Sequence, residues 1–307
     1  MPLGALTACS AAAQPLRVAA DGWVGYAPLF LAQEMGQLPE AAVKLLEFPS
    51  NTASMLALVN GEVAAAALTL DELLVAREGG VDARVALVFD ESCGADVVMA
   101  RKDIGSLTEL RGRRIGVEST AVGALMLSRA LALAGLAPLD IVMVPLTVDQ
   151  HRVAFLDKRI DAVVTYEPTA SRLREVGAQP LLDSSRLPGL IVDVLAVSGS
   201  AIERQPDALR QLIACHFQAL AHMRTNPANA ARLLAPHQRL KPAGVEDALR
   251  GVKLATAPDN QRWLGGSEPQ LIETAQSVGQ LMVDAKLLQR LPDTRALCEP
   301  RFLSEAL

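Results

Sequence analysis

Residues 16–28 read LRVAADGWVGYAP, a strand-like run followed by a loop that carries a tryptophan and a tyrosine. Leu16–Ala20 favours a β-strand, and Pro28 favours the first turn of a helix. Only 3% of the 307 residues are aromatic, so Trp23 and Tyr26 stand out. Amphipathic rings in a loop after a strand are typical of small-molecule clefts, where they supply shape and stacking. We therefore expect both rings to face a ligand; ordinary half-buried packing is the competing interpretation.

A second aromatic motif has the same design. Residues 161–168 read DAVVTYEP, so the chain's other tyrosine, Tyr166, also ends an apolar run and lies just before a proline. We expect Tyr166 and Glu167 to face the same cleft as the first motif. For Glu167, interaction with the start of the next helix is an equally good interpretation.

The chain after Leu16 alternates between strand and helix patterns. Apolar runs at 43–48 and 63–68 each lead into a helical pattern, and from residue 106 onward the order repeats. Beyond Gln205 the pattern is helical and loop-like, with no clear strand. This alternation predicts an α/β fold.

The repeated order predicts two lobes and a helical C-terminal tail. We expect residues 16–100 and 194–307 to form lobe 1 and residues 101–193 to form lobe 2. The chain would then cross between the lobes near Ala100 and near Asp193, which makes a two-strand hinge. Ligands of open α/β sheets bind at the carboxyl ends of the strands, so the cleft should lie between the lobes.

Polar residues at two predicted helix starts are candidates for this cleft. They are Asn51, Thr52, Ser119 and Thr120. Hydroxyls and free backbone N–H groups at a helix start bind anions or carbonyl oxygens. Plain capping of the helix explains the same residues equally well.

Carboxylates form the second group of candidates. Asp90 and Asp193 follow or interrupt apolar strands, and Ser92 lies close after Asp90. A buried carboxylate needs a cationic partner or hydrogen-bond donors. A ligand amine or ring N–H would supply them, and so would amides of the local loop. Asp96, in the turn before a strand, is expected to have a structural role.

The composition excludes several classes of function. The net charge is −5 and no basic stripe is present, which argues against nucleic-acid binding. No apolar run approaches the roughly 20 residues that a membrane-spanning helix needs. The four cysteines lack the spacing of a metal site or a disulfide framework, so we expect neither, and no cofactor.

One cysteine lies in a different context. Residues 6–9 read LTAC and precede a spacer of small residues, which resembles a bacterial lipoprotein signal with Cys9 as the lipidated residue. The apolar segment before Cys9 is short for a working signal, so the true start lies upstream or the similarity is chance. We expect residues 1–15 to be a signal remnant and Cys9 to carry a lipid anchor.

Several motifs in this order resemble the solute-binding proteins of bacterial ABC importers. The match starts with Trp-x-Gly-Tyr-x-Pro at 23–28, continues through Ser-Asn-Thr at 50–52 and Asn-Gly-Glu-Val at 60–63, and covers about residues 16–200. It is most similar to the branch that handles nitrate, taurine, aliphatic sulfonates and thiamine-precursor pyrimidines. The segment LRGRRIG at 110–116 recurs across the superfamily and therefore indicates the fold, not the ligand.

The resemblance implies a two-lobed periplasmic binding protein of type II. Such a protein is a monomer without catalytic activity that closes on a small molecule and delivers it to a permease in the inner membrane. It also makes periplasmic localisation and a lipid anchor at Cys9 the expectation.

The ligand class remains open at this point. The candidate loops carry acidic residues and no lysine or arginine, which favours a small nitrogenous solute such as an amine or a pyrimidine-like compound. The alternative is an aliphatic sulfonate, taurine or nitrate bound at the helix starts. A pyrimidine-synthase-like enzyme or a ligand-sensing module on the same fold is the alternative of another class.

Overall fold

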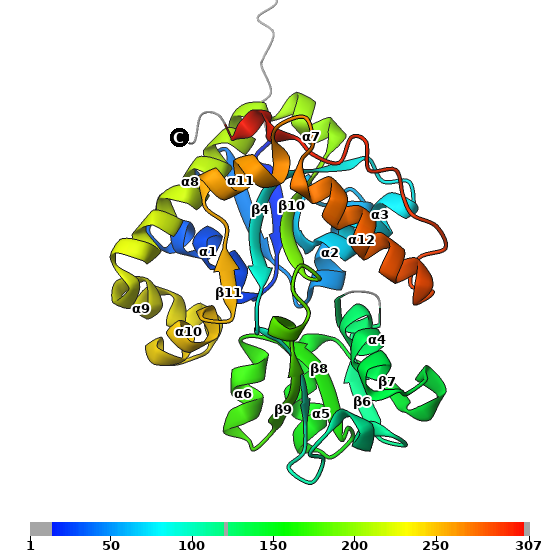
Figure 1. The fold of residues 1–307 in the computed structure, drawn as a ribbon. Helices are drawn as coiled ribbons and strands as arrows, with labels where there is room; N and C mark the ends of the chain where they lie inside the picture. The colour runs from blue at the N-terminus through cyan, green and yellow to red at the C-terminus, as the bar shows by residue number, and fades with distance from the viewer. Residues whose placement is uncertain (1–13, 120–121, 304–307) are drawn as a thin grey trace, which may run out of the picture.

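The computed structural model describes residues 14–119 and 122–303 and shows two lobes, each built on its own sheet (Figure 1). The sheet of lobe 1 has the strand order β11-β4-β10-β3-β1-β2. Its strands are β1 (Leu16–Ala20), β2 (Val43–Glu47), β3 (Ala65–Thr69), β4 (Ala83–Ser92), β10 (Val192–Ser198) and β11 (Val252–Leu254). The α/β fold predicted from the alternating pattern is confirmed.

Lobe 2 has the strand order β7-β6-β8-β5-β9. Its strands are β5 (Asp96–Ala100), β6 (Arg114–Val117), β7 (Val142–Pro145), β8 (Ala162–Tyr166) and β9 (Gln179–Asp183). In both sheets a parallel set of three strands is extended by antiparallel strands, since β10 pairs antiparallel with β3 and β5 pairs antiparallel with β8.

Helices cover the sheets of both lobes (Figure 1). Lobe 2 carries α4 (Val122–Ala134), α5 (Val148–Leu156) and α6 (Thr169–Glu175). Lobe 1 carries α1 (Ala27–Glu34), α2 (Asn51–Val59), α3 (Leu70–Glu78), α7 (Gly199–Arg204), α8 (Pro206–Thr225), α9 (Pro227–Gln238), α10 (Pro242–Leu249), α11 (Ala257–Leu264) and α12 (Gln270–Asp284). Helices α9 and α10 lie at the level of the hinge, on the left in Figure 1.

The chain crosses between the sheets at residues 93–95 and again at residues 184–191. The first crossing was expected near Ala100, and this position is corrected. β5 pairs with β8 along its whole length, so the crossing precedes Asp96. Hydrophobicity marks β5 as a buried strand but does not say which sheet it joins. Ser184 ties the two crossings together, because its Oγ lies 2.8 Å from Ser92 Oγ and accepts from the Gly94 N–H at 2.6 Å.

The C-terminal tail contains a strand that the sequence pattern did not predict. β11 is three residues long and pairs antiparallel with β4 at the edge of the sheet. So short a strand has no usable alternation of polar and apolar residues, and its pairing depends on the neighbouring edge. The helical tail is therefore also a structural part of lobe 1.

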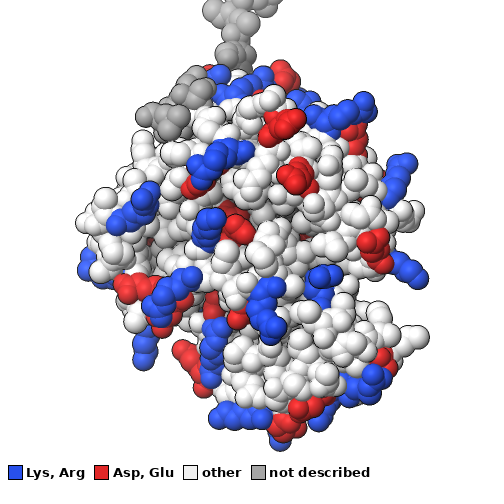
Figure 2. All heavy atoms as spheres, viewed as in Figure 1, with Lys and Arg blue, Asp and Glu red and all other residues white. Residues whose placement is uncertain are grey.

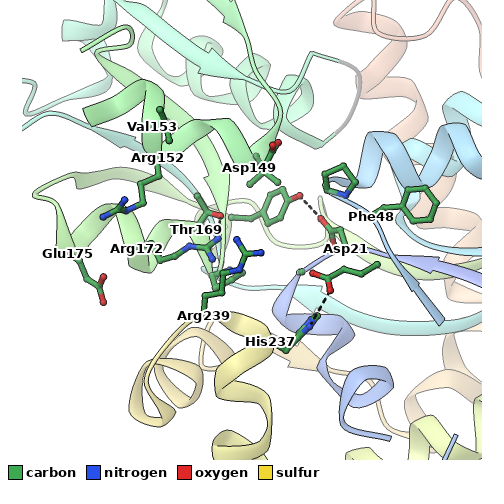
Figure 3. Close-up of a pocket in the computed structure, with 16 residues that line it drawn as sticks. Asp21, Phe48, Asp149, Arg152, Val153, Thr169, Arg172, Glu175, His237 and Arg239 are labelled. Atoms are coloured by element: carbon green, nitrogen blue, oxygen red, sulfur yellow. Dashed lines mark hydrogen bonds and ion pairs between the residues drawn. The ribbon is translucent and has the colours of Figure 1, made fainter. Parts of the chain in front are cut away.

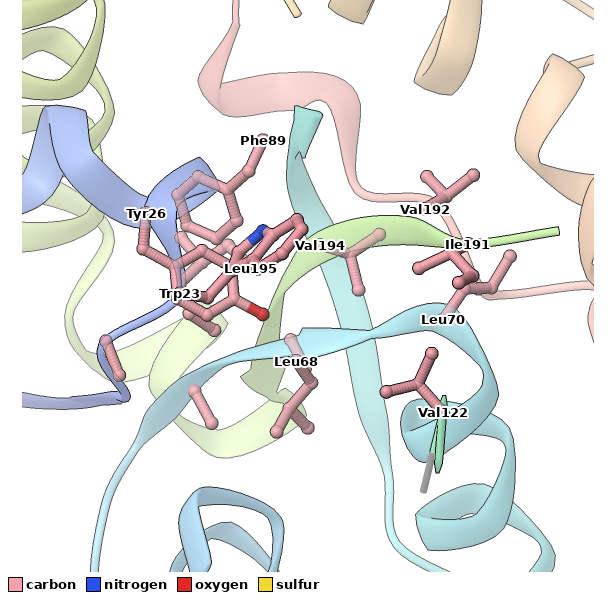
Figure 4. Close-up of a cluster of buried hydrophobic side chains, with 14 of the residues drawn as sticks. Trp23, Tyr26, Leu68, Leu70, Phe89, Val122, Ile191, Val192, Val194 and Leu195 are labelled. Carbon is pink, nitrogen blue, oxygen red and sulfur yellow. The ribbon is translucent and has the colours of Figure 1, made fainter. Parts of the chain in front are cut away.

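The core of lobe 1 reaches the hinge (Figure 4). Tyr26 and Phe89 are fully buried, and their rings meet edge to face with centroids 5.1 Å apart. Apolar residues of β3 and β10 pack around them, including Leu68, Val194 and Leu195. This packing gives the residues at the strand ends a rigid support.

Surface charges are mixed in sign. On the face shown in Figure 2, lysine and arginine side chains alternate with aspartate and glutamate over both lobes. Within the described residues, no helix is both long and apolar enough to span a membrane.

Candidate functional site

Two small adjacent cavities lie at the boundary of the lobes: the first is lined by residues of both lobes and the second by residues of lobe 2. Each has a volume of about 10 Å³, room for about one water-sized group. The first is lined by Trp23, Asn51, Thr69, Asp96, Val122, Tyr166 and Asp193. The second is lined by Asp96, Glu118, Val122, Gly123, His151, Val164, Thr165 and Tyr166. Of the residues described by the structure, no lysine or arginine lines either cavity.

Two aromatic rings from different lobes meet at the first cavity. Trp23 and Tyr166 pack edge to face with centroids 5.6 Å apart, and both are almost completely buried. The Tyr166 hydroxyl donates to Asp21 Oδ2 at 2.6 Å, as Figure 3 shows. Asp21 directly follows β1 in lobe 1, so this hydrogen bond joins the lobes. The site is therefore closed by a contact between the two predicted aromatic motifs.

Asp90 and Asp193 lie opposite each other on the neighbouring strands β4 and β10. One carboxylate oxygen of each residue accepts a hydrogen bond from an aromatic side chain. Trp23 Nε1 donates to Asp90 Oδ2 at 3.2 Å, and the Tyr26 hydroxyl donates to Asp193 Oδ1 at 2.6 Å. The two buried carboxyls are also hydrogen-bonded to each other, and no other described group donates to Asp90 Oδ1 or Asp193 Oδ2.

Other buried acceptors around the cavities are also without a donor among the described residues. They are Asn51 Oδ1, Asp96 Oδ2 and Glu118 Oε1. These residues are 3%, 4% and 7% exposed, so bulk water does not satisfy the oxygens. An unsatisfied buried acceptor costs about 1–3 kcal/mol, and a charged one costs more. The site therefore concentrates hydrogen-bond acceptors that its own residues do not use.

Burial raises the pKa values of these carboxyls. The pKa of Asp21 rises to about 6, that of Asp96 to about 7 and that of Asp90 to about 8, in each case chiefly because burial disfavours the ionised form. The pKa of Asp193 lies well above its ordinary value, because of burial and then the charge of Asp90. A positive charge near these groups would favour their ionised forms and bring the pKa values down.

A larger pocket lies beside Tyr166. Its volume is about 530 Å³, in the range of small-molecule sites. It is formed by Asp21, Gly22, Glu47, Phe48, Pro49, Val148, Asp149, Arg152, Val153, Tyr166, Pro168, Thr169, Arg172, Glu175, His237 and Arg239 (Figure 3). Since Tyr166 and Asp21 belong to its wall, this pocket borders the aromatic contact that closes the site.

Comparison with models of protein families shows which family the chain belongs to. The model of the NMT1-like family matches residues 11–235. The chain belongs to the NMT1-like family. A Brucella abortus relative, proposed to be a binding protein, is 24% identical over 169 residues, 54% of this chain and 53% of the relative. The chain thus spans about half the length of the curated relatives it matches.

Solved structures share the fold of this NMT1-like protein. The alkanesulfonate-binding protein SsuA from Xanthomonas axonopodis, bound to MOPS, has a TM-score of 0.79 at 21% identity, covering 94% of this chain and 99% of SsuA. The desulfurization enzyme DSZB has a TM-score of 0.70 at 17% identity, covering 96% of this chain and 99% of the enzyme. The two-lobed fold is therefore that of SsuA, and the same fold also occurs in an enzyme.

The structure brings four sequence-predicted residues of this NMT1-like protein to one cavity. They are Trp23, Asn51, Tyr166 and Asp193. Tyr26 and Asp90 lie behind this group, where they hold Asp193 and Trp23 by the hydrogen bonds given above.

The remaining described residues that were predicted to bind a ligand do not line the two small cavities. Ser92 supports the hinge through Ser184. Glu167 points to α6 instead of the cavities, since its Oε2 accepts from the Ser171 N–H at 2.9 Å and its Oε1 pairs with Arg174. Ser119 is exposed and lines neither cavity. Thr52 is half-buried at the start of α2, and Thr120 and Cys9 lie outside the described residues.

Three carboxylates around the site were not among the predicted site residues. Asp21 stands in the loop of the first aromatic motif, and its position directly after a strand was a usable signal. Asp96 was expected to be structural, but it lines both cavities as the first residue of β5. Glu118 follows β6 and lies near Thr52 and Ser50, whose hydrogen bonds oppose the rise in its pKa that burial causes. Among the described residues, no group of three side chains is arranged to hold a metal ion.

Proposed function

We propose that this protein is the extracytoplasmic substrate-binding component of an ABC importer and binds a small cationic or N–H-rich solute, such as an amine or a pyrimidine-like compound. The solute binds between the lobes, at the cavities lined by Trp23, Asp96, Tyr166 and Asp193. The protein then delivers it to a permease without changing it chemically.

One observation carries this proposal: buried acceptor oxygens from both lobes converge on a space lined without lysine or arginine. Asn51 of lobe 1 and Asp96 of lobe 2 each have an oxygen that no described group satisfies, and beside them Asp193 of lobe 1 is hydrogen-bonded to Tyr26 and to Asp90. Buried carboxylates of this kind require donors or positive charge. A ligand with N–H donors supplies both, through charge-assisted hydrogen bonds.

The aromatic residues suit the same ligand. The faces of Trp and Tyr attract cations and stack on flat heterocycles. Trp23 comes from lobe 1 and Tyr166 from lobe 2, so a ligand that contacts both favours the closed arrangement. The present cavities hold only water-sized groups, so a ligand of several atoms needs the lobes to move apart at the hinge before it enters.

The geometry supports binding over catalysis. His151 is the histidine beside the cavities, and both of its ring nitrogens are used inside lobe 2, toward Thr165 Oγ1 at 3.1 Å and the Leu146 carbonyl at 3.3 Å. Burial lowers the pKa of His151 to about 4. A histidine held in this way is a poor general base for a bound solute.

A thermal-shift screen tests the proposal directly. Amines, pyrimidine-like compounds and aliphatic sulfonates would be compared at equal concentration. A ligand present at 100 times its Kd adds about 2.7 kcal/mol to the unfolding free energy. We expect the stabilising compounds to be cationic or rich in N–H donors. Stabilisation by sulfonates alone would contradict the proposed ligand class and favour the sulfonate alternative.

A further inference from the structure

A carboxylate of lobe 2 meets the start of a helix in lobe 1. Glu118 directly follows β6, and its side chain accepts hydrogen bonds from the hydroxyl and the backbone N–H of Thr52 and from Ser50. Ser50 caps α2, and Thr52 lies in the first turn of this helix. Glu118 is 7% exposed, so the contact is buried. Because β6 belongs to lobe 2 and α2 to lobe 1, Glu118 joins the lobes, as the hydrogen bond between Tyr166 and Asp21 does.

Helix α2 has no acidic residue of its own at its start. Its first turn contains no aspartate or glutamate, whereas the first turn of α3 contains Asp71 and Glu72. The free N–H groups at a helix start carry a partial positive charge and attract anions. At α2 the group that meets this charge is the carboxylate of Glu118, which comes from the other lobe. Glu118 therefore stands where an anion would otherwise be attracted.

This place belongs to the site at which we propose that the solute binds. Asn51, the first residue of α2, lines the first small cavity, and Glu118 lines the second. The charge of Glu118 contributes to raising the pKa values of Asp21 and Tyr166, so it acts across the site. Its Oε1 atom has no donor among the described residues. An anionic group beside this oxygen would be repelled, whereas an N–H donor would satisfy it.

We propose that Glu118 is the residue that excludes anionic solutes from this protein. It fills the place at the start of α2 that the negatively charged end of a solute would take, and its own charge repels such a group from the rest of the site. Discrimination between ligands commonly uses a repulsive group against the wrong one. The inference rests on the proposed function for the position of the solute between the lobes.

Titration calorimetry with ethanesulfonate, in a Tris-chloride buffer that contains no other sulfonate, tests this role. The wild-type protein should bind ethanesulfonate very weakly. Glu118→Ala removes the carboxylate and leaves the N–H groups at the start of α2 open to the ligand. It should bind ethanesulfonate at least about tenfold more tightly than the wild type, because a repulsive contact is replaced by charge-assisted hydrogen bonds.

Two control variants should leave the exclusion in place. Glu118→Asp shortens the side chain but keeps a carboxylate in the site, so it should bind ethanesulfonate as weakly as the wild type. Glu62→Ala makes the same change of net charge as Glu118→Ala at an exposed glutamate beyond the other end of α2. It should also bind as the wild type does, which separates a local effect from a change in overall charge.

A further variant keeps the test decisive if Glu118→Ala does not fold. Glu118→Gln has almost the same size as the wild-type residue and lacks only its charge, and its amide can donate to a sulfonate. It should also gain ethanesulfonate binding, by a smaller factor than Glu118→Ala because the side chain still fills the place. Circular dichroism and the melting temperature show which variants are folded. The proposal is overturned if no folded neutral variant binds ethanesulfonate more tightly than the wild type, or if the wild type already binds it as tightly as Glu118→Ala.

Failure of this inference can be told apart from failure of the proposed function. If the Glu118 variants gain sulfonate binding while no amine or pyrimidine-like compound binds the wild type, the role of Glu118 stands and the proposed ligand class fails. If such a compound binds the wild type and no folded Glu118 variant gains sulfonate binding, the ligand class stands and the role of Glu118 is overturned.

Discussion

Gly25 allows the first aromatic motif to pack closely against the carboxylate of Asp90. A Cβ atom on Gly25 would lie 1.9 Å from Asp90 Oδ2 and 2.3 Å from Trp23 Nε1, the two atoms of one hydrogen bond. A side chain at this position would therefore displace Trp23, Asp90 or both. The glycine in the motif Trp-x-Gly-Tyr is required by this close approach and not by an unusual backbone angle.

Gly25→Ala should lower the unfolding free energy by about 1–3 kcal/mol, the usual range for overpacking a closely packed site. Tryptophan fluorescence should change as well, because the indole loses its partner. Gly22→Ala is the control, since no heavy atom lies within 4 Å of a Cβ there. Urea unfolding of both variants measures the effect, and equal stabilities would show that the contact is unimportant.

Part of the site was visible in the sequence at this scale. Trp23, Tyr166 and Asp193 were predicted from aromatic and acidic residues at strand ends, and the structure places them at one cavity. Asp96 was not predicted as a site residue, because an aspartate before a strand is most often a turn residue. The arginines of the larger pocket were missed for a different reason: Arg152 and Arg172 lie on α5 and α6 and Arg239 follows α9, and no local pattern marks their convergence.

At the scale of elements, β4 has a β-bulge, and a side chain of α11 satisfies backbone hydrogen-bonding groups at this bulge. Val88 pairs with Val194 and Asp90 with Asp193, so Phe89 is an extra residue in β4. The side chain of Asn260 in α11 accepts from the Val88 N–H at 2.7 Å and donates to the Val88 carbonyl at 2.9 Å. The bulge thereby sets the positions of the residues that follow it in β4, from Asp90 to Ser92.

Asn260→Ala should lower the unfolding free energy by at least about 2 kcal/mol, because it leaves two buried backbone groups without partners. Asn229→Ala, on α9 and far along the chain from the bulge, is a suitable comparison: its side chain is hydrogen-bonded to His222 and not to a strand. Chemical denaturation would measure both. A loss at Asn260 no greater than at Asn229 would argue against this role of the bulge.

The pattern of strands and helices predicted the element types well and their partners less well. β5 is apolar after Asp96 and fits either sheet, so the first crossing was placed after it instead of before it. β11 is too short to show a period, and only the free edge of β4 makes it a strand. Both errors concern pairing, which depends on residues far apart in the sequence.

At the scale of the whole molecule, the hydrogen bond between Tyr166 and Asp21 joins the lobes. Tyr166→Phe should shift the protein toward an open arrangement, so its radius of gyration by small-angle scattering should increase. Tyr26→Phe is a matched control, since it removes an equally short hydrogen bond, 2.6 Å, within lobe 1. If both variants scatter alike, the bond does not hold the lobes together.

The buried carboxyls also make the stability of the protein depend on pH. The pKa values of Asp96 and Asp90 are about 7 and about 8 in the folded protein, well above those of the unfolded chain, so the folded state binds more protons. Stability should therefore fall as pH rises through this range, by up to about 1.4 kcal/mol per pH unit for each group. The pKa values of His151 and His216, lowered to about 4 and about 3, oppose the trend below their ordinary value of 6.5. The clear window is thus pH 6.5 to 8.

Urea unfolding across that window tests the effect. Asp96→Asn should show a smaller loss of stability with rising pH than the wild type. Asp157→Asn, at an exposed position, should not differ from the wild type. A stability that is flat or rising between pH 6.5 and 8 would mean that the carboxyls are not buried as described.

The central claim is that the acidic cavities receive positive charge or N–H donors from a solute. Calorimetric titration of the tightest-binding compound from the screen tests it most directly, with wild type, Asp193→Asn, Asp96→Asn and the Asp157→Asn control. We expect the first two variants to lose about 1.5–3 kcal/mol of binding free energy, the range for hydrogen bonds to a charged group, and the control to lose none. Equal or tighter binding by both Asp193→Asn and Asp96→Asn would contradict the claim, because it would show that the carboxylates repel the ligand.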